Sequence, residues 1–518
     1  HPGPAPAPAA PVTRRPHHGR TLPLSPAQRR LWYLAQLRPG STEYNTATGF
    51  RLRGDLDTAA LGAALDALAA RHEPLRTTFH TVDGEGVQRV GAPRPVPVGT
   101  VDLTGLPEAD RAAAEDRAVR GELGRAFDLE HGPPLRVLVV RRDAGDHLLV
   151  LHQHHLVTDG WSVGVLTEEL GALYSAALRG ERARLPPLTL RYADHAVRQA
   201  ERAAAPEREA SLAHWRRRLA GLVPLELPTD RPRPAVRAAA GAVHRFLVPA
   251  ALTARLTEVG RAVGATPFMV LTAALQVLLA RTCGRQDIAL ATVLSGRDRV
   301  ELEPLAGFFA HTVVLRSQAE PALLFDGFLR AVRSTVLDAF THGEVPYDEV
   351  VRAVRPERDA SRSPLAQVAL VLQNAPRPGL RMAGLRAEDA ELPGLTSLFD
   401  MTWEFEPRQG ALAGTVQYDT DLFDPATPAR LADRLGVLLA GIADDPGRPL
   451  DRLPLLPAAE ARQLARWSTG EAADLPETTV HALVAEQARL RPGAVALSYG
   501  DTRLTYAELA ARADRLAA

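Results

Sequence analysis

A short apolar strand that ends in histidines and leads directly into a helix is the feature that most restricts the fold of this chain. Residues 148–162 read LLVLHQHHLVTDGWS, so an apolar run is followed by His152, His154 and His155 and then by an Asp-Gly turn. Beyond Gly160 the apolar residues recur at helical spacing and share one face: Trp161, Val165, Leu166, Leu170, Leu173 and Leu178. A strand that turns straight into an amphipathic helix is typical of α/β folds, and functional residues gather in such turns.

Strand and helix patterns alternate along most of the 518 residues, which at roughly 100–200 residues per domain suggests about three units. Helices are expected at 26–37, 58–70, 161–178, 265–280, 427–443 and 479–489. Strands are expected at 48–53, 147–152, 313–316 and 367–373, with a strand-turn-strand at 495–505. Ser25 and Gln28 form a capping-box pattern at the start of the first helix.

We expect an α/β protein with α+β sandwich lobes. The predicted division is a Pro/Ala-rich linker at 1–20, a first lobe at 21–200, a second lobe at 201–455 that includes a proline-punctuated connector at 201–240, a loop-like linker at 456–477, and the truncated start of a further domain at 478–518.

The composition excludes several classes of function. Basic and acidic side chains number 61 each, so the net charge gives no reason to expect nucleic acid or an anionic membrane as a partner. All basic residues are arginine, which excludes Schiff-base and phosphate-loop lysines. Cys283 is the only cysteine, which excludes an internal disulfide and a CxxC metal site. The longest apolar stretch, 267–280, is too short to span a membrane, and no secretory signal is visible, so a cytoplasmic protein is expected.

Three interpretations compete for the histidines: a metal site, a proton-transfer site, or an accidental cluster in a core. A regular strand places His152 and His154 on one face and His155 on the other. A metal needs three or four convergent ligands, so we expect none here. His155 at the strand end is then a candidate base, with Asp159 as a helix cap and Gly160 allowing close backbone approach, while His154 is interpreted as structural.

These residues resemble a known family. His154–Gly160 is similar to the HHxxxDG signature of condensation domains from nonribosomal peptide synthetases. Other segments resemble the further motifs of that family in the family's order: 25–34 (SPAQRRLWYL) with Tyr44-Asn45, 71–79 (RHEPLRTTF), Tyr192-Ala193-Asp194 with Trp215, 307–316 (GFFAHTVVLR), Val345-Pro346-Tyr347 and 358–365 (RDASRSPL). The resemblance covers about 20–460, and the first two motifs look like the elongation type that accepts an L-configured donor and an L-configured acceptor.

The resemblance implies a fold like that of chloramphenicol acetyltransferase: two lobes in a V-shaped pseudo-dimer, with the active site at the seam. It implies that the amine of an acceptor aminoacyl group attacks a donor aminoacyl or peptidyl thioester. Both groups would arrive on the 4′-phosphopantetheine arms of an upstream and a downstream carrier protein. No cofactor is expected on the chain itself, and a monomer is expected.

The resemblance also suggests roles for single residues. His155 is the expected base, or the group that orients the amine, and Gly160 is expected to offer its N–H to the developing oxyanion, with Ser162 as a weaker candidate. Asp159 is expected to be structural. The family implies that it pairs with an arginine of the second motif, for which we choose Arg76. His154 and Arg71 are further supporting candidates, and the tunnel candidates are Ser25, Trp161, Ser162 and His311.

The fifth motif departs from the family pattern, because Ala310-His311 stand where the family usually has Val-Asn. His311 is thus a second titratable group, a substrate-specific contact, or a neutral change. A polar group in a tunnel can set substrate orientation.

Four alternatives to ordinary amide formation stay open. They are an acyltransferase of the same fold that uses a soluble coenzyme-linked donor, an epimerisation domain, a catalytically silent carrier-docking module, and a condensation domain that modifies the residue during coupling. Residues 479–509 resemble the opening of an adenylation domain, and this order of domains disfavours the first two.

Overall fold

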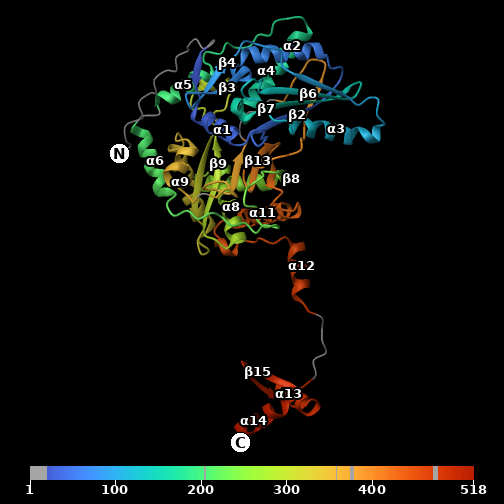
Figure 1. The fold of residues 1–518 in the computed structure, drawn as a ribbon, viewed down its shortest axis with the longest axis vertical. Coiled ribbons are helices and arrows are strands. Elements are labelled where there is room, and N and C mark those ends of the chain that lie inside the picture. Colours follow the sequence, from blue (N-terminus) through green and yellow to red (C-terminus); the bar gives the residue numbers. More distant parts are fainter. Residues whose placement is uncertain (1–19, 203–205, 358, 374–378, 471–476) are drawn as a thin grey trace. The chain divides into compact units, whose positions relative to one another are not determined.

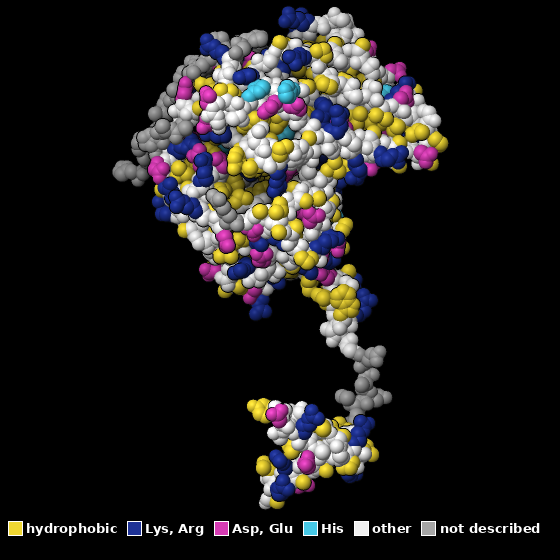
Figure 2. All heavy atoms as spheres, viewed as in Figure 1, with side chains coloured by type: hydrophobic (Ala, Val, Ile, Leu, Met, Phe, Trp, Pro, Cys, Tyr) yellow, Lys and Arg dark blue, Asp and Glu magenta, His cyan; other side chains and the backbone are white. Residues whose placement is uncertain are grey.

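The computed structural model describes residues 20–202, 206–357, 359–373, 379–470 and 477–518. The chain divides into two compact units, one ending at Leu456 and one beginning at Pro457. The linker expected at 1–20 lies outside the described residues except for Arg20. Side chains of both charges are mixed over the visible surface of the larger unit, in keeping with the zero net charge (Figure 2).

The larger unit contains most of the secondary structure (Figure 1). Its helices are α1 (Pro26–Leu37), α2 (Thr58–Arg71), α3 (Glu108–Leu123), α4 (Gly160–Leu178), α5 (Tyr192–Glu201), α6 (Pro206–Arg218), α7 (Ala250–Ala262), α8 (Pro267–Cys283), α9 (Phe325–Thr341), α10 (Tyr347–Val354) and α11 (Ala426–Asp444). Its strands are β1 (Thr21–Pro23), β2 (Asn45–Arg53), β3 (Thr77–Val82), β4 (Glu85–Val90), β5 (Val98–Asp102), β6 (Leu135–Asp143), β7 (Asp146–His154), β8 (Gly241–Val248), β9 (Asp287–Leu294), β10 (His311–Gln318), β11 (Val368–Leu372), β12 (Arg386–Ala390), β13 (Met401–Arg408) and β14 (Ala411–Asp419).

The histidine-bearing strand β7 lies at the centre of the first lobe, in a sheet of order β12-β2-β7-β6-β5. Successive side chains of a strand point to opposite faces. Leu149 and Leu151 accordingly pack in the cluster with α2 and α4, while Leu148 and Val150 pack in the cluster with α3. Burial on both faces explains why the strand reads as a continuous apolar run rather than as an alternating one.

The second lobe is built on a sheet of order β10-β9-β11-β13-β14-β8. The apolar helix α8 packs in its core with α7, α9 and α11. Gln276, a polar residue within this helix, is buried and donates to the carbonyl oxygen of Leu315 at 3.1 Å, so its side-chain N–H is satisfied. Among the described residues no single helix is long and apolar enough to cross a membrane, although α7 and α8, bent by 99°, pass that test as a pair.

The structure corrects three details of the prediction. Residues 386–390, placed by the sequence in the second lobe, form β12 and pair with β2 of the first sheet, because the chain crosses between the lobes. Leu178, predicted on the buried face of α4, is 43% exposed at the helix end. The expected loop at 456–477 contains the helix α12 (Ala458–Ser468), whose alanine, arginine and leucine are strong helix formers.

The smaller unit contains α12, α13 (Val480–Leu490), the hairpin of β15 (Val495–Tyr499) and β16 (Thr502–Thr505), and α14 (Tyr506–Ala517). The elements expected at 479–489 and 495–505 are therefore present. Thr505 caps α14 with a capping box to Glu508.

Candidate active site

Two cavities meet inside the larger unit. Cavity 1, of about 920 Å³, is lined by α1, by the turn between β7 and α4, and by residues of β9, β10 and β11. Cavity 2, of about 1100 Å³, lies toward α5, α8 and α9. Val293, Ser295, Arg297 and Leu372 line both cavities, so the two cavities adjoin along this wall.

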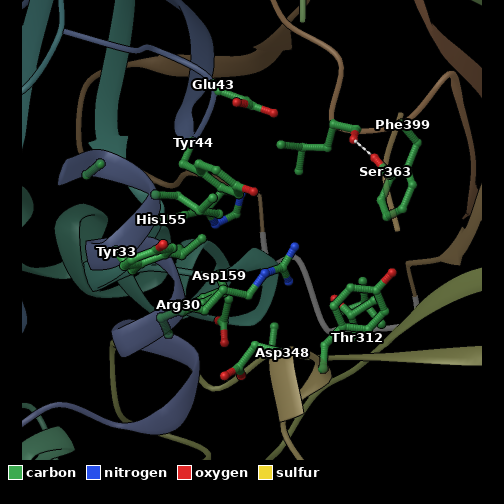
Figure 3. Close-up of a pocket in the computed structure, with 18 of the residues that line it drawn as sticks. Arg30, Tyr33, Glu43, Tyr44, His155, Asp159, Thr312, Asp348, Ser363 and Phe399 are labelled. Carbon is green, nitrogen blue, oxygen red and sulfur yellow. Dashed lines mark hydrogen bonds between the residues drawn. The ribbon is translucent and has the colours of Figure 1, made fainter. Parts of the chain in front are cut away.

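His155 leaves the strand at the rim of cavity 1. The regular strand ends at His154, and a 3₁₀ turn over His155–Val157 redirects the chain. The His155 backbone N–H donates to the carbonyl oxygen of Tyr44 at 2.9 Å, which fixes the position of the residue. In Figure 3 the side chain lies beside Tyr44 and Arg30, with Thr312, Ser363 and Phe399 on the opposite wall.

One hydrogen bond fixes the proton on the His155 ring. Nδ1 lies 3.1 Å from the carbonyl oxygen of Thr158. A carbonyl oxygen only accepts, so Nδ1 carries the hydrogen and Nε2 keeps its lone pair. Within the described ranges no residue hydrogen-bonds to Nε2, and the side chain lines cavity 1. Nε2 of His155 can therefore accept a proton from a group held in that cavity.

Burial lowers the pKa of His155 below its ordinary value, and the Thr158 carbonyl and the Asp159 carboxylate oppose that shift. Phe308, with its ring centroid 5.7 Å from that of His155, contributes to the apolar surroundings. The imidazole is therefore neutral near neutral pH, the state in which it can act as a base.

His154 also lines cavity 1, but its ring is held by the backbone and is not available as a base. Its Nδ1 accepts the backbone N–H of Leu156 at 3.1 Å, and burial lowers its pKa to about 3. The Phe127 ring contacts both His152 and His154, with centroid distances of 4.8 and 6.3 Å, so these two histidines share a face as the strand alternation predicts. His152 pairs with Glu122 at 3.0 Å.

Asp159 is saturated with hydrogen bonds. It is the N-cap of α4, and its Oδ1 accepts the backbone N–H and the hydroxyl of Ser162 at 2.8 and 2.7 Å. Its Oδ2 accepts Nη1 of Arg297 at 2.8 Å and the backbone N–H of Phe309 at 3.0 Å. Both partners of Oδ2 lie in the second lobe, between β9 and β10. The carboxylate thus joins the two lobes directly behind His155.

The prediction that Asp159 pairs with Arg76 is wrong. Arg76 donates to the carbonyl oxygen of Gly91 and lies 3.7 Å from Glu73, both in its own part of the first lobe. Arg297 takes the predicted place, with its side chain 1% exposed and stacked 4.1 Å from the Phe309 ring centre. Arg71 also lies apart from cavity 1 and pairs with Glu169 at 2.8 Å.

Two other candidates do not line either cavity. The buried Ser162 hydroxyl lies 2.7 Å from Asp159 and 2.8 Å from the carbonyl oxygen of Gly307, so it has no hydrogen to offer an oxyanion. Ser25 is buried as the cap of α1, and its hydroxyl contacts that of Tyr192 at 2.8 Å. Both serines join parts of the fold instead of facing substrate.

The remaining candidates divide between the cavities. Gly160 and Trp161 line cavity 1, and the indole N–H of Trp161 donates to the carbonyl oxygen of Glu303 at 2.9 Å. His311 lines cavity 2, whereas its neighbours Ala310 and Thr312 line cavity 1. Strand alternation at β10 explains this separation. Among the described residues no group of three or more His, Cys, Asp or Glu side chains could hold a metal ion.

Two residues of the site were not recognised in the sequence. Arg297 belongs to Ser295-Gly296-Arg297-Asp298, a polar segment directly after the apolar strand β9, and that position could have marked it as functional. Gln373 follows β11 and places its side-chain oxygen 3.4 Å from the point where a Cβ on Gly160 would lie. No local pattern indicates Gln373.

Gly160→Ala is expected to slow the acyl transfer that the sequence resemblance implies, while leaving the fold intact. The added methyl group would touch the Gln373 side chain at 3.4 Å and narrow cavity 1 beside His155. A substrate that this methyl group moves should react about tenfold or more slowly, because a misplacement of about 1 Å can cost about 10²-fold in rate. Turnover and thermal unfolding should be measured beside Gly436→Ala, a helical position with nothing within 4 Å of the new Cβ. Equal turnover of Gly160→Ala and wild type would show that the space at Gly160 is not needed.

His154 is expected to make the fold sensitive to acid. The unfolded chain binds a proton there near pH 6.5, whereas the folded chain does so only near pH 3. The free energy of unfolding should therefore fall as the pH is lowered from about 6.5, by up to about 1.4 kcal/mol per pH unit. His154→Asn keeps an acceptor for Leu156 and should reduce the slope in denaturant titrations between pH 7 and 5 by the share of one histidine, while His195 and the other buried histidines keep theirs. An unchanged slope would exclude His154 as its source.

Comparison with known proteins agrees with this geometry. A family profile described as Condensation domain matches residues 19–465. One of the linear gramicidin synthase proteins of Brevibacillus parabrevis is 40% identical over 511 residues, which is 98% of this chain and 10% of that protein. Phosphinothricin tripeptide synthetase PhsC of Streptomyces viridochromogenes is 40% identical over 521 residues, which is 100% of this chain and 47% of that protein. The chain thus spans half or less of the length of these relatives.

Solved structures share the fold. The X-domain from teicoplanin biosynthesis aligns with a TM-score of 0.77 at 29% identity, over 86% of this chain and 100% of that one. The starter condensation domain of rhizomide synthetase RzmA aligns with a TM-score of 0.73 at 21% identity, over 84% of this chain and 98% of that one. The expected architecture of two α/β lobes with the histidine motif at their seam is confirmed.

Proposed function

Because this chain belongs to the condensation domain family of nonribosomal peptide synthetases, we propose that it forms an amide bond between two carrier-bound aminoacyl groups. The amine of the acceptor attacks the thioester of the donor, and the donor's thiol leaves. The observation that carries the proposal is the hydrogen bond from His155 to Thr158, which leaves Nε2 with a lone pair beside cavity 1.

The required chemistry is within reach of a neutral histidine. An acceptor α-amine has a pKa of roughly 7.7–8.0, so an appreciable minority is unprotonated near neutral pH. As the N–C bond forms, Nε2 of His155 accepts the proton that the amine loses. Such acid–base help is typically worth about 10²–10⁴-fold. Holding the two reactants in place can contribute more, on the order of 7–11 kcal/mol.

The turn that carries His155 also offers a place for the developing oxyanion. Gly160 is the first residue of α4 and lines cavity 1. The first N–H groups of a helix have no partner within the helix and lie at its positive end. The Gly160 N–H is therefore our candidate donor to the oxyanion. Asp159 supports the reaction through its hydrogen bonds to Arg297 and Phe309, which hold the turn against the second lobe.

The direct test uses two loaded carrier proteins. An upstream carrier bearing a donor aminoacyl group and a downstream carrier bearing an acceptor aminoacyl group are mixed with the chain, and the intact mass of the downstream carrier is followed. The proposal requires that this mass rise by the donor acyl group. A further loss of water would indicate a modifying condensation domain. Absence of transfer with several L-configured donors, while both carriers bind, would overturn the proposal.

That last outcome would favour a second candidate, a docking module without catalysis. A protein of the same fold, the X-domain from teicoplanin biosynthesis, is solved in complex with OxyB. The intact His155 geometry favours catalysis over this alternative. As partners we propose an upstream and a downstream carrier protein and an adjoining adenylation domain, and as location the cytoplasm. The helices α13 and α14 bury no residue, which fits a unit that packs against further protein.

A further inference from the structure

Cavity 2 contains a pair of histidines that the proposed reaction does not use. His311 lies on the edge strand β10, opposite Leu294 of β9. It packs closely on Gly296, since a Cβ there would lie 2.8 Å from the His311 ring. His195 comes from α5 and packs on the Phe309 ring with centroids 4.8 Å apart. Segments 116 residues apart thus bring two imidazoles to one cavity.

Both imidazoles are neutral and line cavity 2. Burial, helped by His311 and by the guanidiniums of Arg297 and Arg198, lowers the pKa of His195 to about 3. Burial also lowers the pKa of His311, although the negative charges of Asp298 and Asp159 partly oppose this shift. His195 is 7% exposed, and its side chain lines cavity 2.

Arg198 has a buried donor atom without a partner in the described part of the chain. It follows His195 by three residues on α5, so the two side chains are neighbours on the helix. Its Nη1 is buried and makes no hydrogen bond within the described residues. Arg299 and Arg202 add positive charge around it, while Asp298 and Glu344 oppose them.

The described lining of cavity 2 contains more guanidinium groups than carboxylates. Its described lining carries five guanidinium groups, at Arg198, Arg202, Arg208, Arg297 and Arg299, and two carboxylates, at Asp298 and Glu344. Two carboxylates from outside the lining neutralise two of the guanidiniums: Asp159 pairs with Arg297, and Glu349 pairs with Arg208. The N-terminus of α8, at Thr266–Met269, also lines the cavity and adds the positive end of a helix dipole.

We propose that cavity 2 selects an aminoacyl or peptidyl substrate with a carboxylate side chain, which His195, His311 and Arg198 recognise. Each neutral imidazole offers one N–H, and Arg198 offers its free Nη1. A carboxylate accepts several such bonds at once, and its negative charge strengthens each of them. The inference rests on the proposed function, because it assumes that one carrier arm delivers its acyl group through cavity 2.

The place of His311 favours a side-chain carboxylate over the phosphate of a carrier arm. Phe309, whose backbone N–H donates to Asp159, packs on His195, and Gly296, the neighbour of Arg297, packs on His311. Arg297, the partner of Asp159, lines both cavities. The histidines therefore lie at the end of cavity 2 that is nearest to the reacting atoms. An acyl group reaches that end, whereas the phosphate of a pantetheine arm stays at the far end of the arm.

The test compares substrates that differ only in charge. Carriers loaded with aspartate or asparagine, and with glutamate or glutamine, are supplied in turn on the donor side and on the acceptor side. On one side the wild type should transfer the acid faster than its amide by about tenfold or more, as expected for a charge-assisted hydrogen bond. His311→Asn and Arg198→Gln should each bring the ratio close to one. His131→Asn, the same change at a side chain that is 79% exposed, should leave the ratio as in the wild type.

Two outcomes would overturn the inference while leaving the proposed function in place. One is equal transfer of acids and amides by the wild type on both sides. The other is a decrease in the transfer rate of His311→Asn that is equal for all four substrates. That result would mean that His195 and His311 bind the pantetheine arm instead of the side-chain carboxylate. Binding of aspartyl- and asparaginyl-pantetheine amides, measured by calorimetry, requires no turnover. If the wild type binds the aspartyl compound more tightly than the asparaginyl compound and Arg198→Gln does not, the inference is supported even if transfer fails. Equal affinity of the wild type for the two compounds would overturn it.

Discussion

His155→Ala is expected to slow transfer between loaded carriers by about 10²–10⁴-fold, the range typical of lost acid–base help. The substitution removes Nε2, which has a lone pair beside cavity 1. Some transfer should persist, because positioning of the two reactants does not depend on the imidazole. The measurement is a single-turnover time course of the downstream carrier's intact mass.

The fold should survive this substitution. His155 is anchored through its backbone N–H to Tyr44, and its side chain makes one hydrogen bond, to Thr158. We expect the unfolding midpoint of His155→Ala to stay close to that of the wild type. A loss of transfer with an unchanged midpoint assigns the effect to chemistry. A loss below about threefold would contradict a role for His155 in proton transfer.

Arg297→Met is expected to destabilise the larger unit by about 3–5 kcal/mol, the cost of leaving one partner of a buried ion pair without the other. The side chains of Arg297 and Asp159 are 1% and 5% exposed, so water cannot replace the lost contact. The free energy of unfolding from denaturant titration measures the effect. Arg352→Met is the matched control, because Arg352 is 69% exposed and pairs with Asp348 on the surface of α10. That change should cost less than about 1 kcal/mol.

A double-mutant cycle separates the ion pair from the packing of the arginine. Asp159→Asn and Arg297→Met together should cost clearly less than the sum of the two single changes, because the second change removes a charge that the first has left unpaired. If the losses in the free energy of unfolding were additive, a direct ion pair between Asp159 and Arg297 would be contradicted. The same cycle with Arg76→Met and Asp159→Asn should be additive, since Arg76 is bound to Gly91 and lies near Glu73 instead.

The contrast between these two arginines shows what the sequence could predict. Capping patterns are local, so Ser25 and Gln28 predicted the start of α1, and Asp159 predicted the start of α4. Strand alternation likewise predicted that His152 and His154 share a face. In each case the partners lie within a few residues of one another, and the backbone geometry of a helix or strand fixes their relation.

Contacts between distant segments could not be predicted in the same way. Arg297 meets Asp159 across 138 residues, and nothing local to either residue names the other. The crossing of β12 into the first sheet depends on the packing of both lobes, which the local pattern at 386–390 does not encode. The position of His311 could be inferred only in part: the alternation on β10 separates it from Thr312, but the cavity that each residue faces depends on the whole fold.

The role of His155 as proton acceptor depends on one nitrogen atom, Nε2. Nitrogen NMR of ¹⁵N-histidine-labelled protein reports which ring nitrogen carries the hydrogen, and comparison with His155→Asn assigns the signals. The structure predicts a neutral His155 at about pH 7, protonated on Nδ1 through the bond to Thr158 and bare on Nε2. A hydrogen on Nε2 at that pH, either in the other tautomer or in an imidazolium, would contradict the assignment of His155 as the proton acceptor.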